Sequence, residues 1–214
     1  SGKSTLARLV SRLLDADAGT IRLDGWQRAW ETLAPALGRT FSMVIPAALI
    51  SALVGSMNGF VLSRWRFPGA DLVFTLILFG MFIPYQAVMI PLREIVTTIG
   101  IPPGIPTLVF VHCVYGIPIC TLIFRNYYAT TVPEELIEAA RVDGAGLLRT
   151  FTRIILPLSM PALATTAIFT FIWTWNDFFS QLIYLTDPDM YTVPVALRSF
   201  VDATVSTSWG SMFA

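Results

Sequence analysis

Few side chains in this sequence could carry out chemistry, and three of them fall in one apolar run. Cys113 and Cys120 are seven residues apart, which on a helix is roughly 10 Å along the axis and too far for a disulfide. We interpret both as small buried hydrophobic residues. The single histidine, His112, is either a functional residue inside a membrane or a hydrogen-bonded residue in the interior of a helix bundle, and we favour the second interpretation. These residues fit neither a metal site nor a nucleophilic triad.

The N-terminus carries part of a phosphate-binding motif. Gly2, Lys3, Ser4 and Thr5 resemble the end of a loop whose backbone amides wrap phosphates when a further glycine lies four residues before the Gly-Lys pair. Residues 1–25 as a whole resemble a fragment of an ABC transporter ATPase. We expect a vestigial nucleotide-binding segment from a truncated or chimeric reading frame. The alternative is a genuine ATPase–permease fusion that binds nucleotide.

The composition excludes most classes of soluble protein. Of the 214 residues, 13% are charged and 55% are hydrophobic, whereas soluble domains have about 25% charged residues. The mean hydropathy is +0.67. The net charge is zero, so the basic face of a nucleic-acid binder is missing. Because alternating strand patterns are also missing, we predict an all-α integral membrane protein.

Uncharged stretches predict about four membrane-spanning helices. Each stretch has about 18 to 24 residues, enough at 1.5 Å per residue to cross a hydrocarbon core of about 30 Å. The stretches are residues 40–63, 72–92, 107–124 and 154–176. We expect a kinked bundle, because a proline bends a helix and membranes tolerate such bends. The prolines concerned are Pro46, Pro84, Pro91, Pro118, Pro157 and Pro161.

The arginines predict how these helices are oriented. The loops at residues 64–71 and 125–153 share one side and carry six arginines, against two on the opposite side. The six-arginine side is therefore expected to be cytoplasmic. Residues 1–39 fall on the opposite side and add six lysines and arginines to it, which reverses the count. We infer that residues 1–39 do not belong to the same membrane domain as the spans.

The long loop at residues 130–158 has the clearest local signals. Pro133 suits a first helical turn, and the acidic residues after it favour a helix N-terminus, so we predict a helix over residues 133–142. Thr131 and Glu134 have the spacing of a capping box. Gly144 should end this helix in a left-handed conformation, and a second short helix should follow at about residues 147–153.

The same loop resembles the EAA loop of binding-protein-dependent ABC importer permeases. Glu138-Ala139-Ala140 is followed after three intervening residues by Gly144, after nine further intervening residues by Ile154, and then by Leu156-Pro157. Other stretches resemble the carbohydrate-uptake branch, in particular the smaller membrane subunit of maltose-type permeases. These stretches are residues 62–69, 83–92, 125–136, 140–145 and 173–178, and the resemblance covers roughly residues 26–214.

The resemblance implies a transport subunit rather than an enzyme, in the cytoplasmic (inner) membrane of a prokaryote. Its partners would be a second permease subunit, a homodimeric cytoplasmic ABC ATPase and an extracytoplasmic sugar-binding protein, with no nucleic acid. The chain itself would bind no cofactor, because ATP and magnesium lie on the ATPase. The family also has a further span at each end, so we expect a truncated permease domain at residues 40–214, preceded by a linker at residues 26–39. A free-standing channel is disfavoured, since the spans carry no charged or carbonyl-lined filter.

The resemblance also assigns roles to particular residues. The contact with the ATPase would be made by a coupling element consisting of Glu135, Glu138, Ala139, Ala140, Asp143 and Gly144. Ala139 and Ala140 form a small-residue patch suited to a partner's groove; the alternative is a solvated connection that binds nothing. Candidate sugar contacts are Trp173, Trp175, Asn176 and Asp177. Aromatic residues are equally typical of a membrane interface, and we favour that interpretation.

Overall fold

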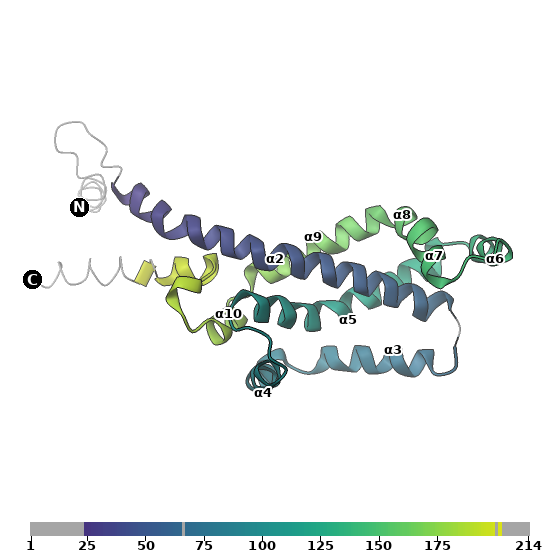
Figure 1. The fold of residues 1–214 in the computed structure, drawn as a ribbon, viewed down its shortest axis with the longest axis horizontal. Helices are drawn as coiled ribbons and strands as arrows, with labels where there is room; N and C mark the ends of the chain where they lie inside the picture. Colours follow the sequence, from purple (N-terminus) through teal and green to yellow (C-terminus); the bar gives the residue numbers. More distant parts are fainter. Residues whose placement is uncertain (1–23, 66, 200, 203–214) are drawn as a thin grey trace, which may run out of the picture.

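The computed structural model describes residues 24–65, 67–199 and 201–202, and this part of the chain contains helices and no strand. The P-loop-like residues 2–5 lie outside it. Figure 1 shows an elongated bundle in which α2, α5 and α9 run along the long axis. The helices are α2 (Asp24–Arg64), α3 (Ala70–Phe79), η1 (Gly80–Phe82), α4 (Tyr85–Thr98), α5 (Ile105–Thr131), α6 (Glu134–Val142), α7 (Leu147–Thr150), the π-helix η2 (Phe151–Ile155), α8 (Leu156–Leu158), α9 (Met160–Asn176), α10 (Phe179–Tyr184) and η3 (Pro188–Met190).

Two continuous helices form the centre of the bundle. Leu33–Arg64 of α2 and Ile105–Thr131 of α5 are both long and apolar enough to cross a membrane, and they include the stretches predicted at residues 40–63 and 107–124. Residues 26–39 belong to the same helix as the first of these spans. The two helices pack with their backbones close together, because glycines lie at the contact: a Cβ atom on Gly55 would lie 2.3 Å from the Cβ atom of Cys120.

The other two predicted spans are broken rather than straight. The segments Ala70–Phe82 and Tyr85–Thr98 meet at 106°, and Leu147–Leu158 meets Met160–Asn176 at 79°. Length and composition therefore allow two spans, or up to four if each bent pair crosses once. The prolines differ in position: Pro46, Pro91 and Pro118 lie inside continuous helices, whereas Pro84 lies at the first break.

Local backbone chemistry explains where the breaks fall. Ile83 is extended, with φ −77° and ψ 120°, as expected for a residue that precedes a proline. At the second break, Pro157 has no N–H to donate to the carbonyl of Arg153, and the chain just before it forms the π-helix η2. Ser159 then separates α8 from α9. Each break therefore lies next to a proline, which cannot donate the backbone hydrogen bond of a continuing helix.

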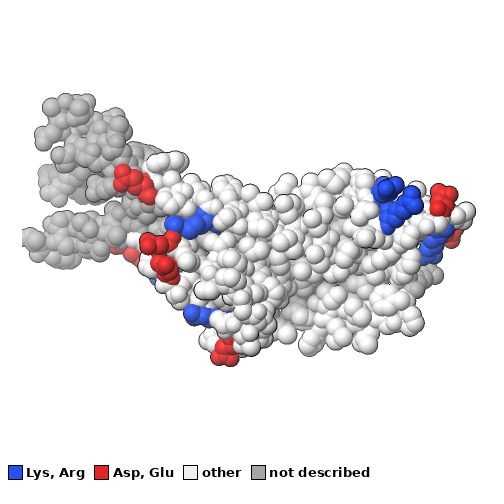
Figure 2. Space-filling view, viewed as in Figure 1, with Lys and Arg blue, Asp and Glu red and all other residues white. Residues whose placement is uncertain are grey.

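The loops gather at two opposite ends of the bundle. We call them the α6 end, which holds the α2–α3 connection, α6 and α7, and the α10 end, which holds α4 and α10 (Figure 1). At the α6 end, Arg125 Nη2 lies 2.8 Å from Asp71 Oδ1, so the two arginine-rich loops share one end as predicted. Figure 2 shows charged side chains towards the ends and an uncharged middle on the face in view, which is the pattern of a hydrocarbon-embedded surface.

Two apolar clusters hold the terminal elements onto the bundle. The cluster at the α6 end packs α6 and η2 against α2 and α5, and the cluster at the α10 end packs α10 against the same two helices. The first consists of Phe60, Phe124, Tyr128, Val132, Ile137, Phe151 and Ile155, and the second of Met43, Val44, Leu108, Val111, Tyr184 and Leu185. Both ends therefore have a fixed relation to α2 and α5.

Candidate functional site

The helix α6 forms much as the sequence predicts. Its first turn carries Glu134 and Glu135, and its last turn carries Arg141, so both ends complement the helix dipole. Its C-terminus closes in a Schellman motif, in which the Gly144 N–H donates to the Arg141 carbonyl at 3.0 Å and the Ala145 N–H to the Ala140 carbonyl at 2.9 Å. Gly144 has the predicted left-handed conformation, with φ +72°.

One local prediction for this loop was wrong. The capping box does not form, because Thr131 is the last residue of α5 and Pro133 is the N-cap of α6, without a side-chain cap hydrogen bond. The second short helix begins at Leu147 as predicted, and a π-helix continues it from Phe151 to Ile155. The chain therefore turns from α5 into α6 through the extended backbone of Val132 and Pro133.

The predicted coupling residues do not all lie on one surface. Ile137 and Ala140 are buried against the bundle, with 3% and 4% of their surface exposed. The opposite side of α6 is exposed and forms a stripe with helical spacing, which we call the α6 stripe. It consists of Glu135, Glu138, Ala139 and Val142. The structure thus separates Ala139 from Ala140, which corrects the prediction of a joint small-residue patch.

Val142 is the residue that the sequence interpretation missed. Its side chain is 88% exposed at the end of the α6 stripe, next to the exposed Asp143 and Gly144. A single exposed apolar side chain is common on protein surfaces, so Val142 matters for its place on the α6 stripe rather than for its exposure alone. The spacing of Glu135, Glu138 and Val142 could have identified it, because residues three, four and seven apart share a helix face.

Arginine side chains fasten α6 and α5 to the end of α2. The guanidinium of Arg141 lies 5.1 Å from the ring centroid of Trp65, and its Nη2 donates to the Arg64 carbonyl at 3.5 Å. Arg64 in turn donates to carbonyls at the C-terminus of α5: those of Tyr128, Ala129 and Val132. A cavity of about 250 Å³ lies between Arg64, Trp65, Glu134 and Arg141.

A buried tyrosine also connects segments at the α6 end through hydrogen bonds. The Tyr128 hydroxyl lies 2.6 Å from Ser56 Oγ on α2 and donates to Ser159 Oγ at 3.1 Å. Ser159 is the residue at the break between α8 and α9. Tyr128 therefore connects three segments that surround the attachment of the loop.

The four candidate sugar contacts lie at the α10 end but not on one surface. Trp173 is 63% exposed, whereas Trp175 packs against Phe41 and Phe171, with ring centroids 5.4 and 5.7 Å apart. Asn176 is exposed and donates from Nδ2 to the Ile172 carbonyl at 2.8 Å. The Asp177 side chain is only 10% exposed. The structure therefore does not assemble these residues into a single open site.

Asp177 lies instead in a buried polar group that includes the lone histidine. Its Oδ2 is 3.6 Å from His112 Nε2, and the His112 side chain is 4% exposed. Its Oδ1 accepts from the backbone N–H of Ser180 at 3.3 Å, in the first turn of α10. His112 is buried as predicted, but among the described residues its Nε2 has no hydrogen-bond partner, which corrects the expectation of a hydrogen-bonded residue.

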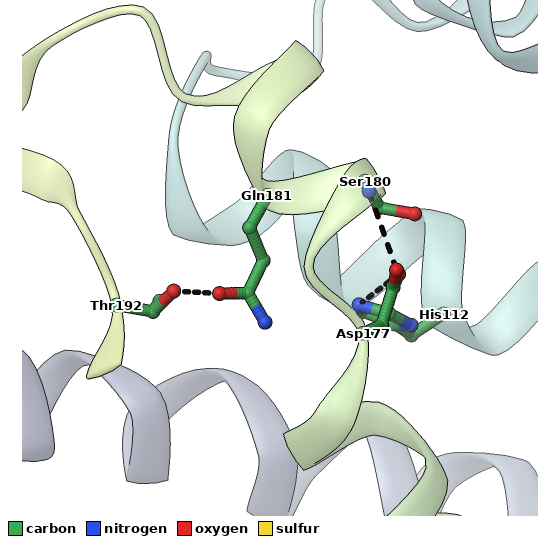
Figure 3. A network of polar contacts seen from close by, with 5 residues as sticks. All are labelled: His112, Asp177, Ser180, Gln181 and Thr192. Carbon is green, nitrogen blue, oxygen red and sulfur yellow. Dashed lines mark hydrogen bonds and ion pairs between the residues drawn. The ribbon is translucent and has the colours of Figure 1, made fainter. Parts of the chain in front are cut away.

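The polar group continues across α10 towards α2 (Figure 3). Thr192 donates from its hydroxyl to Gln181 Oε1, and the next backbone N–H, that of Val193, donates to Thr40 Oγ1 of α2 at 2.9 Å. On the other side of α10, Tyr184 donates to the Met89 carbonyl of α4 at 2.8 Å. Hydrogen bonds thus link α10 to both α2 and α4.

The hydroxyl of Tyr184 stays protonated at any physiological pH. Burial raises the pKa of Tyr184 to about 12, with a further contribution from Tyr115, while Arg93 acts in the opposite direction. The hydrogen bond to Met89 is therefore made by a neutral donor. We expect this contact between α10 and α4 to be independent of pH below the raised pKa.

Comparison with known proteins identifies the class. Residues 45–214 match the family described as binding-protein-dependent transport system inner membrane component. Since the match covers most of the chain, the protein belongs to this family. This confirms the predictions of a helical membrane permease and of a transport component rather than an enzyme.

Curated relatives of this chain include permeases named for sugar import. The glucose import system permease protein of Saccharolobus solfataricus is 33% identical over 190 residues, which are 86% of this chain and 66% of that protein. The melibiose/raffinose/stachyose import permease protein of Bacillus subtilis is 32% identical over 184 residues, or 84% and 66% of the two chains. The osmoprotective compounds uptake permease protein of Synechocystis is 34% identical over 163 residues, or 76% and 54%. The chain spans between about half and two thirds of the length of these relatives.

Proposed function

We propose that this chain is a membrane-spanning subunit of an ATP-driven sugar importer and that it contacts a cytoplasmic ATPase through the α6 stripe. The observation that carries the proposal is the shape of α6: one face is fixed to the bundle by Ile137 and Ala140, and the opposite face is free to meet a partner. Membership of a binding-protein-dependent transport family supports it. The α6 end is then the cytoplasmic end, in the inner membrane of a prokaryote.

The chemistry of the α6 stripe suits insertion into a shallow groove. Ala139 allows close approach of a partner, and Val142 offers an apolar side chain that is desolvated on contact. Glu135 and Glu138 flank these residues, and they favour a partner with basic groups beside an apolar floor. The fixed inner face of α6 matters equally, because a movement of the ATPase can reach the spans only through a rigid attachment.

A sugar is the substrate class that the relatives favour. The relatives compared above are named for uptake of glucose, of melibiose, raffinose and stachyose, and of osmoprotective compounds. On this proposal an extracytoplasmic binding protein delivers the sugar at the α10 end, and a second permease subunit completes the pathway. Trp173 and Asn176 are the candidate contacts with exposed side chains, whereas Trp175 and Asp177 contribute by holding the helices around them.

Charge introduced on the α6 stripe tests the contact with the ATPase. We expect Val142→Asp to abolish co-purification of the ATPase from membranes that contain the whole importer, because the carboxylate would be desolvated without a partner. Ile99→Asp is the matched control, since Ile99 is also an exposed apolar residue, 57% exposed, but lies at the α10 end. If both variants retain the ATPase, or both lose it, α6 is not the specific contact.

A further inference from the structure

The helix α5 has polar contacts at three levels with α9 and the residues that flank it. Near the α6 end, Tyr128 donates to Ser159 at 3.1 Å. Near the middle, Cys120 Sγ lies 3.6 Å from Thr170 Oγ1. At the α10 end, His112 Nε2 lies 3.6 Å from Asp177 Oδ2. His112 and Tyr128 are about 24 Å apart along α5, at 1.5 Å per residue.

These two helices are also the ones attached to the loop that carries α6. The chain passes from Thr131 of α5 through Val132 and Pro133 into α6, and it returns through α7, η2 and α8 into α9. A displacement of α6 therefore pulls directly on both helices. Whether it reaches the α10 end as one movement depends on whether α5 and α9 stay together there.

At the α10 end, the contact between His112 and Asp177 is the specific connection. A carboxylate that is 10% exposed inside a helical membrane protein needs a cation or a shared proton, and His112 is the basic group within 4.0 Å of Asp177 among the described residues. Its Nε2 has no hydrogen-bond partner in that part of the chain, so Asp177 is the polar group it faces. Each side chain is therefore the buried polar neighbour that the other faces.

Asp177 also contacts the first turn of α10. It follows directly after α9, has an extended backbone with φ −73° and ψ 111°, and accepts a hydrogen bond from Ser180 in the first turn of α10. An acidic acceptor at this position stabilises a helix N-terminus. One carboxylate therefore connects α5 to the α9–α10 break (Figure 3), and hydrogen bonds from α10 and the residues after it reach α4 and α2.

We propose that His112 is a positioning residue which, by pairing with Asp177, fastens α5 to the α9–α10 break so that the two helices attached to the coupling loop move as one body. The inference rests on the proposed role of α6 as the ATPase contact. When the pair is absent, movement of α6 still follows the ATPase, but the α10 end no longer follows α6. ATP hydrolysis then continues without a matching amount of sugar import.

The test measures both activities in one preparation of the whole importer in proteoliposomes, with the binding protein and a radiolabelled sugar. The variants are Asp177→Asn, which keeps an oxygen acceptor for Ser180 but removes the charge, and His112→Gln. We expect both complexes to retain the ATPase. Sugar imported per ATP hydrolysed should fall about tenfold or more, because each variant removes one partner of a buried pair. The double variant His112→Asp with Asp177→His should recover at least part of that loss.

Asp71→Asn is the matched control, because Asp71 likewise contacts a basic side chain, that of Arg125, but is itself 91% exposed. This variant should leave the amount of sugar imported per ATP unchanged. The proposal is overturned if the ratio is unchanged in the single variants. It is also overturned if only the sugar concentration for half-maximal import changes, which would make Asp177 a sugar contact. A third contradicting result is that the exchanged pair behaves no better than the single variants. Co-purification of the ATPase with Val142→Asp is measured separately. Failure of the proposed ATPase contact can therefore be distinguished from failure of the proposed role of His112 and Asp177.

Discussion

The guanidinium of Arg64, at the end of α2, donates to the carbonyl of Tyr128 in the last turn of α5 through both Nε, at 3.1 Å, and Nη2, at 2.6 Å. The same side chain reaches the carbonyls of Ala129 and Val132. One arginine thus satisfies carbonyls that the end of a helix leaves without partners. Because α6 follows immediately, Arg64 fixes the point from which the coupling loop departs.

Replacement of Arg64 should therefore destabilise the bundle at the α6 end. We expect Arg64→Met to lower the free energy of unfolding by about 1.5 to 3 kcal/mol, the range for hydrogen bonds to charged groups. Arg64→Lys should recover only part of it, since an ammonium lacks the planar fork of donors. Unfolding of the purified protein in mixed micelles measures both values. The exposed Arg149 provides the control Arg149→Met, and an equal loss in the control would contradict the capping role.

Gly144 should be intolerant of any side chain for a purely conformational reason. A Cβ atom there would meet no atom within 4 Å, but φ is +72°, a region that costs other residues about 1 to 2 kcal/mol. Gly144→Ala and Gly144→Leu should thus cost nearly the same and both weaken co-purification of the ATPase. Gly146→Ala is the control, because Gly146 has equal space and φ −74°. If Gly146→Ala is as harmful as Gly144→Ala, the left-handed turn is not the cause.

The sequence predicts the parts of this fold that depend on local chemistry or on the exclusion of charge. Hydrocarbon excludes charged residues, so gaps between charges indicate the apolar segments, and two of them are continuous spans. The end of α6 at Asp143-Gly144 follows from the turn preference of glycine alone. The sharing of one end by the two arginine-rich loops follows from counting the crossings.

The remaining features depend on contacts between distant residues. Proline alone does not distinguish Pro118, inside a continuous helix, from Pro84, at a break of 106°, because neighbouring helices decide whether the chain can bend away. The inward orientation of Ala140 follows from the packing of Ile137 in the α6-end cluster. His112 and Asp177 are 65 positions apart in the sequence, so their pairing is visible only once α5 and α9 are placed.

The close approach of α2 and α5 predicts a large effect of adding a single methyl group. A Cβ atom on Gly55 would lie 2.3 Å from Cys120 Cβ and 2.9 Å from backbone atoms of Cys120 and Thr121, so the two helices would have to separate. We expect Gly55→Ala to cost about 1 to 3 kcal/mol, as overpacking does. Gly38→Ala, in the same helix with no atom within 4 Å, should be neutral or stabilising by up to about 1 kcal/mol. Thermal unfolding of the two variants in detergent should give shifts of opposite sign or at least very different size.

Tyr128 offers a comparison with its own neighbour. Its buried hydroxyl bonds to Ser56 on α2 and to Ser159 at the α8–α9 break, so Tyr128→Phe leaves two buried serine hydroxyls with one partner fewer while the ring packing remains. We expect a loss of about 1 to 3 kcal/mol, the cost of leaving buried polar groups unsatisfied. Tyr127→Phe should have a smaller effect, because Tyr127 is only half-buried. If the α8–α9 break depends on this hydroxyl, hydrogen exchange of the backbone amides around Ser159 will rise in Tyr128→Phe and not in Tyr127→Phe. Equal exchange in the two variants would show that the bend at Ser159 is maintained by Pro157 and Pro161 without help from α5.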